Sequence, residues 1–121
     1  MRSREWYVSV LHDLAGTKKA LERQTANSDK CGNEMKALDA RVKSMLADVK
    51  GTVINSDFDV DATADALMTI QDVAAARDRW AAKLSDSVLE EDRIEESLQH
   101  LLDQLLAFPM GEVAEQTKDA E

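Results

Sequence analysis

The sequence predicts an all-α protein, an elongated antiparallel three-helix bundle with left-handed packing like that of coiled coils. Three observations support this fold class. Aromatic residues make up 4% of the 121 residues, with one proline and four glycines. Helix-forming residues dominate, whereas strand formers are too sparse for a sheet. Apolar residues recur at steps of three and four on both sides of one strong break near residues 51–61. We expect one domain, residues 1–109.

The first helix is predicted near residues 4–50. Its stripe has two heptad-like halves, offset by a skipped residue near 28–31: Leu11, Leu14, Lys18, Leu21, Thr25 and Ser28, then Cys31, Met35, Leu38, Val42, Met45 and Val49. The polar middle, with Gly32 and Asn33, leaves two alternatives, one long helix or two helices in a hairpin. A glycine costs a helix only about 1 kcal/mol and no proline is present, so we expect one helix.

The second helix is predicted near residues 60–85. Residues 51–61 combine Gly51, a β-branched run and an Asn/Ser/Asp cluster, which favours a loop followed by a helix N-cap. Either Asp61 or Ser56 is the expected cap. The aspartates at 57, 59 and 61 have the spacing of a calcium loop. However, Ala62 and Met68 stand where that loop needs Gly and Glu, so a metal site is not expected.

The third helix is predicted near residues 88–108. Ser87 and Glu90 have the spacing of a capping box, and the apolar residues from Ile94 onward are out of step with Leu84 and Val88. Both observations favour a turn at residues 85–87. Pro109 and Gly111 should end this helix, and residues 110–121 are predicted to form a disordered acidic tail. A two-helix hairpin that dimerises is the alternative architecture.

The charge is negative and unevenly distributed. Residues 1–50 carry ten Lys/Arg and seven Asp/Glu, and residues 51–121 carry five and seventeen, so +3 and −12 give the net −9. This balance is unfavourable for binding nucleic acid or an anionic membrane.

The single cysteine, Cys31, excludes an internal disulfide and suits a reducing compartment. With neither a signal peptide nor an apolar run of about 20 residues, we expect a cytoplasmic protein.

No residue pattern predicts catalysis, a cofactor or a metal. His12 and His100 have no ligand-spaced neighbours, and Cys31 lies on the apolar stripe, where a small core residue is expected. The carboxylates at 90, 91, 92, 95 and 96 fall in the first turns of the third predicted helix, where acidic residues suit the helix dipole. The sequence contains neither a phosphate-binding loop nor a nucleophile motif, so we do not expect an enzyme.

The entry to the second helix resembles the tubulin-binding cofactor A family. Residues 58–67 match its aromatic-Asp-aliphatic triplet and following leucine through Phe58, Asp59, Val60 and Leu67. Residues 79–84 are similar to a later Arg-rich, Ala-containing run of that family. The sequence departs from the family at Thr63, which replaces Gln, and lacks its mid-helix proline. Length, acidic second half and the expected three-helix layout agree.

The resemblance implies a non-enzymatic chaperone, associated with the cytoskeleton, that holds free β-tubulin before the αβ heterodimer forms. The residues expected to contact the partner are Phe58, Glu90, Glu91 and Glu95. Two alternatives remain open. One is a structural coiled-coil subunit of a larger complex, which would dimerise through the face from Leu98 to Leu105. The other is a small secretion chaperone or adaptor. Monomer and homodimer are both compatible with the sequence.

Overall fold

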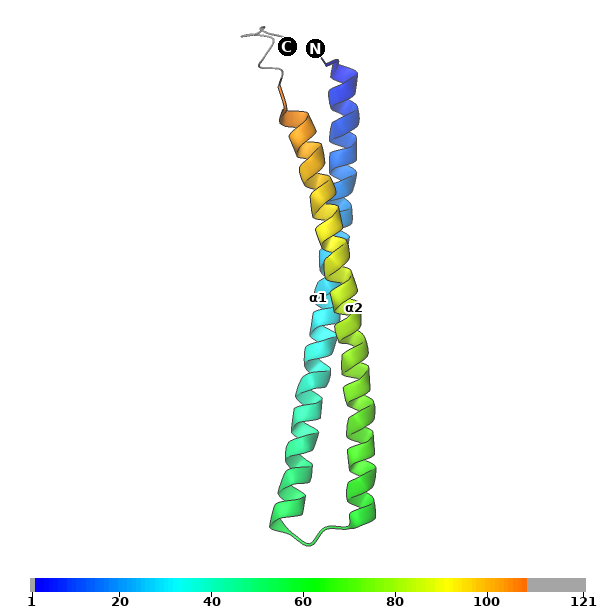
Figure 1. Ribbon diagram of the computed structural model, residues 1–121, viewed down its shortest axis with the longest axis vertical. Helices are drawn as coiled ribbons and strands as arrows, with labels where there is room; N and C mark the ends of the chain where they lie inside the picture. Colours follow the sequence, from blue (N-terminus) through cyan, green and yellow to red (C-terminus); the bar gives the residue numbers. More distant parts are fainter. Residues whose placement is uncertain (1, 109–121) are drawn as a thin grey trace. The chain divides into compact units, whose positions relative to one another are not determined.

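The structure, a computed structural model, describes residues 2–108. These residues form two α-helices and no strand: α1, Arg4–Asn55, and α2, Val60–Leu106. The all-α prediction is confirmed. The predicted tail at 110–121 lies outside the described residues. The chain divides into two compact units. Unit 1 comprises Met1–Gln24 and Glu90–Glu121, and unit 2 comprises Thr25–Leu89. Within each unit, α1 and α2 lie antiparallel (Figure 1).

The prediction of a single first helix is confirmed, and its stripe has no skip. From residue 7 to residue 49, burial along α1 follows an unbroken heptad pattern, in which every a and d position is buried or half-buried: 7, 10, 14, 17, 21, 24, 28, 31, 35, 38, 42, 45 and 49. Thr17 and Gln24 therefore lie on the stripe, where Lys18 and Thr25 were predicted. The apparent skip arose because polar residues occupy seam positions. Gly32 does not interrupt α1, since buried Cys31 and half-buried Met35 on either side keep the helix in contact with its partner.

The three-helix bundle is wrong, because α2 continues through the predicted turn at residues 85–87. Its seam also has one phase, at positions 63, 66, 70, 73, 77, 80, 84, 87, 91, 94, 98, 101 and 105. Ser87 and Glu91 occupy seam positions and carry the phase from Leu84 to Ile94. Ser87 is only 3% exposed and hydrogen-bonds across the seam, so it belongs to the interior and is not a cap. The helices near 60–85 and 88–108 are thus one helix.

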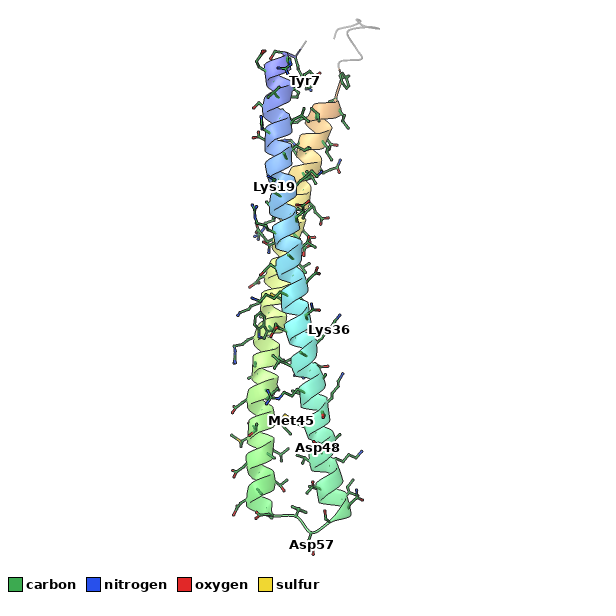
Figure 2. The ribbon with its side chains drawn as sticks, turned by 180° about the vertical axis from the view of Figure 1, so that it is seen from behind. Tyr7, Lys19, Lys36, Met45, Asp48 and Asp57 are labelled. Atoms are coloured by element: carbon green, nitrogen blue, oxygen red, sulfur yellow. The ribbon has the colours of Figure 1, made fainter. Side chains whose placement is uncertain are left out.

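The apolar core of unit 2 is one cluster near the middle of its seam. Val42 on α1 packs with Ile70 and Val73 on α2, and the surrounding half-buried residues are Leu38, Met45, Val49 and Ala74. Figure 2 shows Met45 between the two helices. None of the large side chains in the described part is less than 2% exposed. The seam is therefore a single layer of contacts, open to solvent at both sides.

A polar layer lies at the end of the unit 2 seam that is farther from the loop. The hydroxyls of Ser28 and Ser87 are 2.7 Å apart and both residues are buried. Asn27 donates from Nδ2 to the Ser87 hydroxyl at 3.0 Å. Cys31, one turn along α1, is 3% exposed, as its place on the stripe predicted. A paired polar layer in an otherwise apolar seam favours one register over its neighbours, because any slip leaves buried hydroxyls without their partners.

Candidate protein-interaction surface

The loop between the helices is short and begins α2 with a carboxylate cap. Asp59 Oδ1 accepts a hydrogen bond from the backbone N–H of Ala62 at 3.0 Å. The cap is therefore Asp59, and the prediction of Asp61 or Ser56 is wrong. Asp61 lies in the first turn of α2, where its charge suits the helix dipole. The Ser56 hydroxyl instead donates back to the Thr52 carbonyl at 3.2 Å.

A hollow of about 390 Å³ lies at this loop end of unit 2. Phe58, one of the predicted contact residues, lines it and is 43% exposed. The hollow's other lining residues are Asp48, Val49, Thr52, Asp57, Asp59, Ala62, Thr63 and Ala66. Asp57 is seen at the loop in Figure 2. An exposed aromatic ring thus stands beside three carboxylates.

The surroundings of the hollow are acidic and apolar. From Gly51 to Ala76 the sequence contains five aspartates and neither lysine nor arginine. Ile54 is 66% exposed next to the loop. Among the described residues, no three Asp, Glu, His or Cys side chains are grouped so that they could hold a metal ion. The hollow therefore combines negative charge with exposed apolar area.

The other three predicted contact residues lie in unit 1 and do not share one surface. Glu90 is half-buried, lines a groove with His12 and Asp13, and accepts a hydrogen bond from Arg93 at 3.1 Å. Glu91 is half-buried on the α2 seam, and Glu95 is exposed. The sequence placed all three on the polar face because it assumed a helix beginning at residue 88 with a shifted phase. Leu98, Leu101 and Leu105, the proposed dimer face, are half-buried seam positions.

An ion-pair cluster joins the helices in the middle of unit 2. Asp39 accepts from Arg77 Nη1 at 3.1 Å across the seam and pairs with Lys43 Nζ at 2.9 Å along α1. The hydrogen bond from Lys43, together with that from Arg77, holds the pKa of Asp39 below its ordinary value of 3.8, although burial acts in the opposite direction. Hydrogen bonds to Asp78 and Asp39 raise the pKa of Arg77. The cluster is structural, because its charges pair within the chain.

The hollow at the loop end was only partly predictable. Phe58 was singled out by the resemblance, whereas Asp48 and Thr52 come from the last turns of α1, and only the antiparallel pairing brings them to the loop.

No described helix is long and apolar enough to cross a membrane. Comparison of the chain with models of known families, with curated proteins and with solved structures finds no match in any of the three.

Proposed function

We propose that the chain is a non-enzymatic adaptor that binds another protein at the loop end of its helical hairpin. One observation carries this proposal: the hollow where exposed Phe58 stands beside the carboxylates of Asp48, Asp57 and Asp59. Large exposed apolar side chains next to a hollow are typical of protein-binding sites. Because the Asp59 carboxylate caps α2, the carboxylates of Asp48 and Asp57 are the ones available to contact a partner.

The chemistry of the hollow indicates what its partner presents. A lysine or arginine side chain has an apolar stem and a cationic head, so it can lie against Phe58 while its head meets carboxylates. The 26 residues from Gly51 to Ala76 contain no basic residue to occupy that place. The expected partner is therefore a basic protein segment with apolar neighbours, and the acidic surroundings would speed its approach at low salt.

Photo-crosslinking tests this proposal. A benzoylphenylalanine at position 58 should crosslink a small set of cellular proteins, and the yield should fall as salt is raised. Removing two carboxylates of the hollow with Asp48→Asn and Asp57→Asn should abolish the crosslinks. Asp72→Asn with Asp86→Asn is the matched control, because it removes the same charge from exposed positions outside the hollow. Equal loss with both pairs would mean that only net charge matters and would refute the site.

β-Tubulin is the narrower candidate for the partner. The observation that favours it is the local layout at the loop: a long first helix, a short connection, and the triplet Phe58, Asp59 and Val60 entering α2, as the resemblance to tubulin-binding cofactor A implies. The family's three-helix layout, however, is not found in the described residues. Support for tubulin therefore rests on this segment alone.

Gel filtration with purified tubulin tests the narrower candidate. Co-elution with free tubulin subunits, lost with Phe58→Ser, would support it. A control variant, Leu106→Ser, changes an apolar side chain in unit 1 that is more exposed than Phe58, and it should co-elute as the wild type does. If tubulin fails to co-elute while crosslinks from position 58 persist, the partner is a protein other than tubulin that presents a basic segment. If both experiments are negative, the proposed function is wrong.

A further inference from the structure

The two open sides of the seam differ in character, and the grooves show which positions lie on each side. In unit 1, one groove is lined by Asp13 and Ala20 from α1 and by Glu90 and Ser97 from α2. In unit 2, the hollow is lined by Asp48 and Ala62. All six occupy heptad position g. Within each unit, the g positions of the two helices therefore line one side of the seam, and the e positions line the opposite side.

The e side of unit 2 is an apolar face. On α2, five consecutive e positions are apolar: Val60, Leu67, Ala74, Ala81 and Val88. On α1, the e positions nearest the loop are Leu46 and Val53. The five large side chains of this face are between 41% and 70% exposed. We call these seven residues the apolar face of unit 2.

The apolar face adds a column of apolar residues that two paired helices do not need for their own contact. A helix that pairs with one neighbour needs apolar residues only at a and d, whereas a helix in the core of a bundle has a third column, usually e or g. In residues 60–88 of α2 the e column is apolar throughout, whereas the a and d columns also contain Thr63, Arg77 and Ser87. By contrast, the g positions of unit 2 include Asn27, Glu34, Arg41, Asp48, Thr69 and Lys83. The e side of unit 2 also holds Asp39 of α1, whose ion pairs with Lys43 and Arg77 lie within the chain, so its apolar residues lie along α2 and near the loop.

The edges of the face indicate what covers it. At position b, which borders e, α1 carries lysines in three successive heptads, Lys36, Lys43 and Lys50. The matching edge of α2 carries Asp78 at position b and Asp61 at position f. One edge of the face therefore carries lysines and the other carries these two aspartates, although Lys43 and Asp78 also pair within the chain, with Asp39 and Arg77. A surface of this kind is complementary to its own copy when the copy is turned so that its acidic edge meets the basic edge.

We infer that the apolar face of unit 2 binds the same face of a second copy of this chain. The dimer then consists of two stacked helix pairs related by a two-fold axis. Two arrangements are possible for stacked hairpins. With α1 over α1 of the copy, lysines would meet lysines and aspartates would meet aspartates. With α1 over α2 of the copy, Lys36 lies at the level of Asp78 and Lys50 lies near Asp61, and each attraction occurs twice.

The arrangement with α1 over α2 also matches the apolar residues. The Ser28–Ser87 contact sets the level of the two helices, and counting heptads from it places Leu46 near Leu67 and Val53 near Val60. Turning a copy about an axis parallel to the helices preserves these levels. Leu46 therefore packs on Leu67 of the copy, and both loop ends lie at the same end of the dimer. The hollow, on the g side, stays accessible, so this inference is independent of the proposed function.

Sedimentation equilibrium of the full chain tests the inference. The wild type should behave as two chains of 13.4 kDa in the micromolar range. Leu46→Glu with Leu67→Glu should sediment as one chain, because four carboxylates would be buried in the interface. Ser44→Glu with Thr69→Glu adds the same charge within two residues of each site but outside the face, and it should remain dimeric. A monomeric wild type, or equal masses for the two variants, would overturn the inference.

Charge exchange provides a second test that does not depend on apolar side chains. Lys36→Asp alone should raise the dimer Kd several-fold, and adding Asp78→Lys should restore it, with circular dichroism confirming that the variants are helical. Crosslinking then reports the arrangement. A mixture of Leu46→Cys and Leu67→Cys chains should form disulfide-linked pairs faster than either chain alone. Faster crosslinking of Leu46→Cys with itself, or the absence of charge rescue, would contradict the α1-over-α2 dimer.

Discussion

Ser28 and Ser87 are polar residues buried in the seam, and their hydroxyls depend on each other. Because the two oxygens are 2.7 Å apart and both residues are buried, replacing one serine by alanine removes one hydrogen bond from the other. We predict that each single alanine variant lowers the free energy of unfolding by about 0.5–1.5 kcal/mol. The double variant should cost less than the sum of the two, with a coupling of at least about 0.5 kcal/mol.

Urea denaturation measures this cycle. Ser97→Ala, on the same helix as Ser87, is the control. Because Ser97 is exposed, removing its hydroxyl should change the free energy of unfolding by less than about 0.5 kcal/mol. Strict additivity of the Ser28 and Ser87 variants would show that the two hydroxyls do not support each other.

Asp39 links stability to pH. Its folded pKa is below the ordinary value of 3.8, chiefly through the hydrogen bond from Lys43 and then that from Arg77. A depressed carboxyl pKa contributes stability above the unfolded pKa, and this contribution is lost as pH falls through the folded pKa. We predict that Asp39→Asn lowers the melting temperature at pH 7 and that its difference from the wild type shrinks between about pH 5 and pH 2. Calorimetry across this pH range measures both melting temperatures, and a difference between them that does not change with pH would contradict the prediction.

At the scale of the element, the start of α2 depends on Asp59. Its carboxylate satisfies the N–H of Ala62, which the first turn of the helix leaves without a backbone partner. Asp59→Ala should therefore destabilise the protein by about 0.5–2 kcal/mol. Asp57→Ala removes the same charge two residues earlier and should have a smaller effect. Thermal unfolding by circular dichroism compares the two variants, and equal effects would assign the loss to charge instead of capping.

The elements show what sequence periodicity can and cannot predict. The all-α class, the single first helix and a loop within residues 51–61 followed from composition and turn residues, although α1 runs on to Asn55 and α2 begins at Val60. The turn at residues 85–87 did not exist, because hydrophobic periodicity cannot recognise a seam position filled by a polar residue. Ser87 and Glu91 in α2, like Thr17 and Gln24 in α1, keep the phase while appearing to break it. The continuous phase is present in the sequence, because Ile94 and Leu98 follow Val73 and Ile70 by whole numbers of heptads.

The hollow at the loop end was beyond the sequence for a different reason. Phe58 and the aspartates near it are neighbours in the chain, but Asp48 reaches them through the folding of α2 against α1. Periodicity gives the face of a residue within its helix and not its level against the other helix. That level is set by the polar layer of Ser28 and Ser87, whose pairing became visible only in the structure.

At the scale of the whole molecule, stability and self-association should be linked. The described helices have only five buried hydrophobic residues, so covering the apolar face of unit 2 would enlarge a small core. Because a second copy binds only the folded chain, the melting temperature should rise by about 5 °C when the protein concentration rises a hundredfold. Leu46→Glu with Leu67→Glu should melt at one temperature throughout, whereas Ser44→Glu with Thr69→Glu should follow the wild type. Calorimetry over this range decides, and a wild-type melting temperature independent of concentration would show that the apolar face stays uncovered.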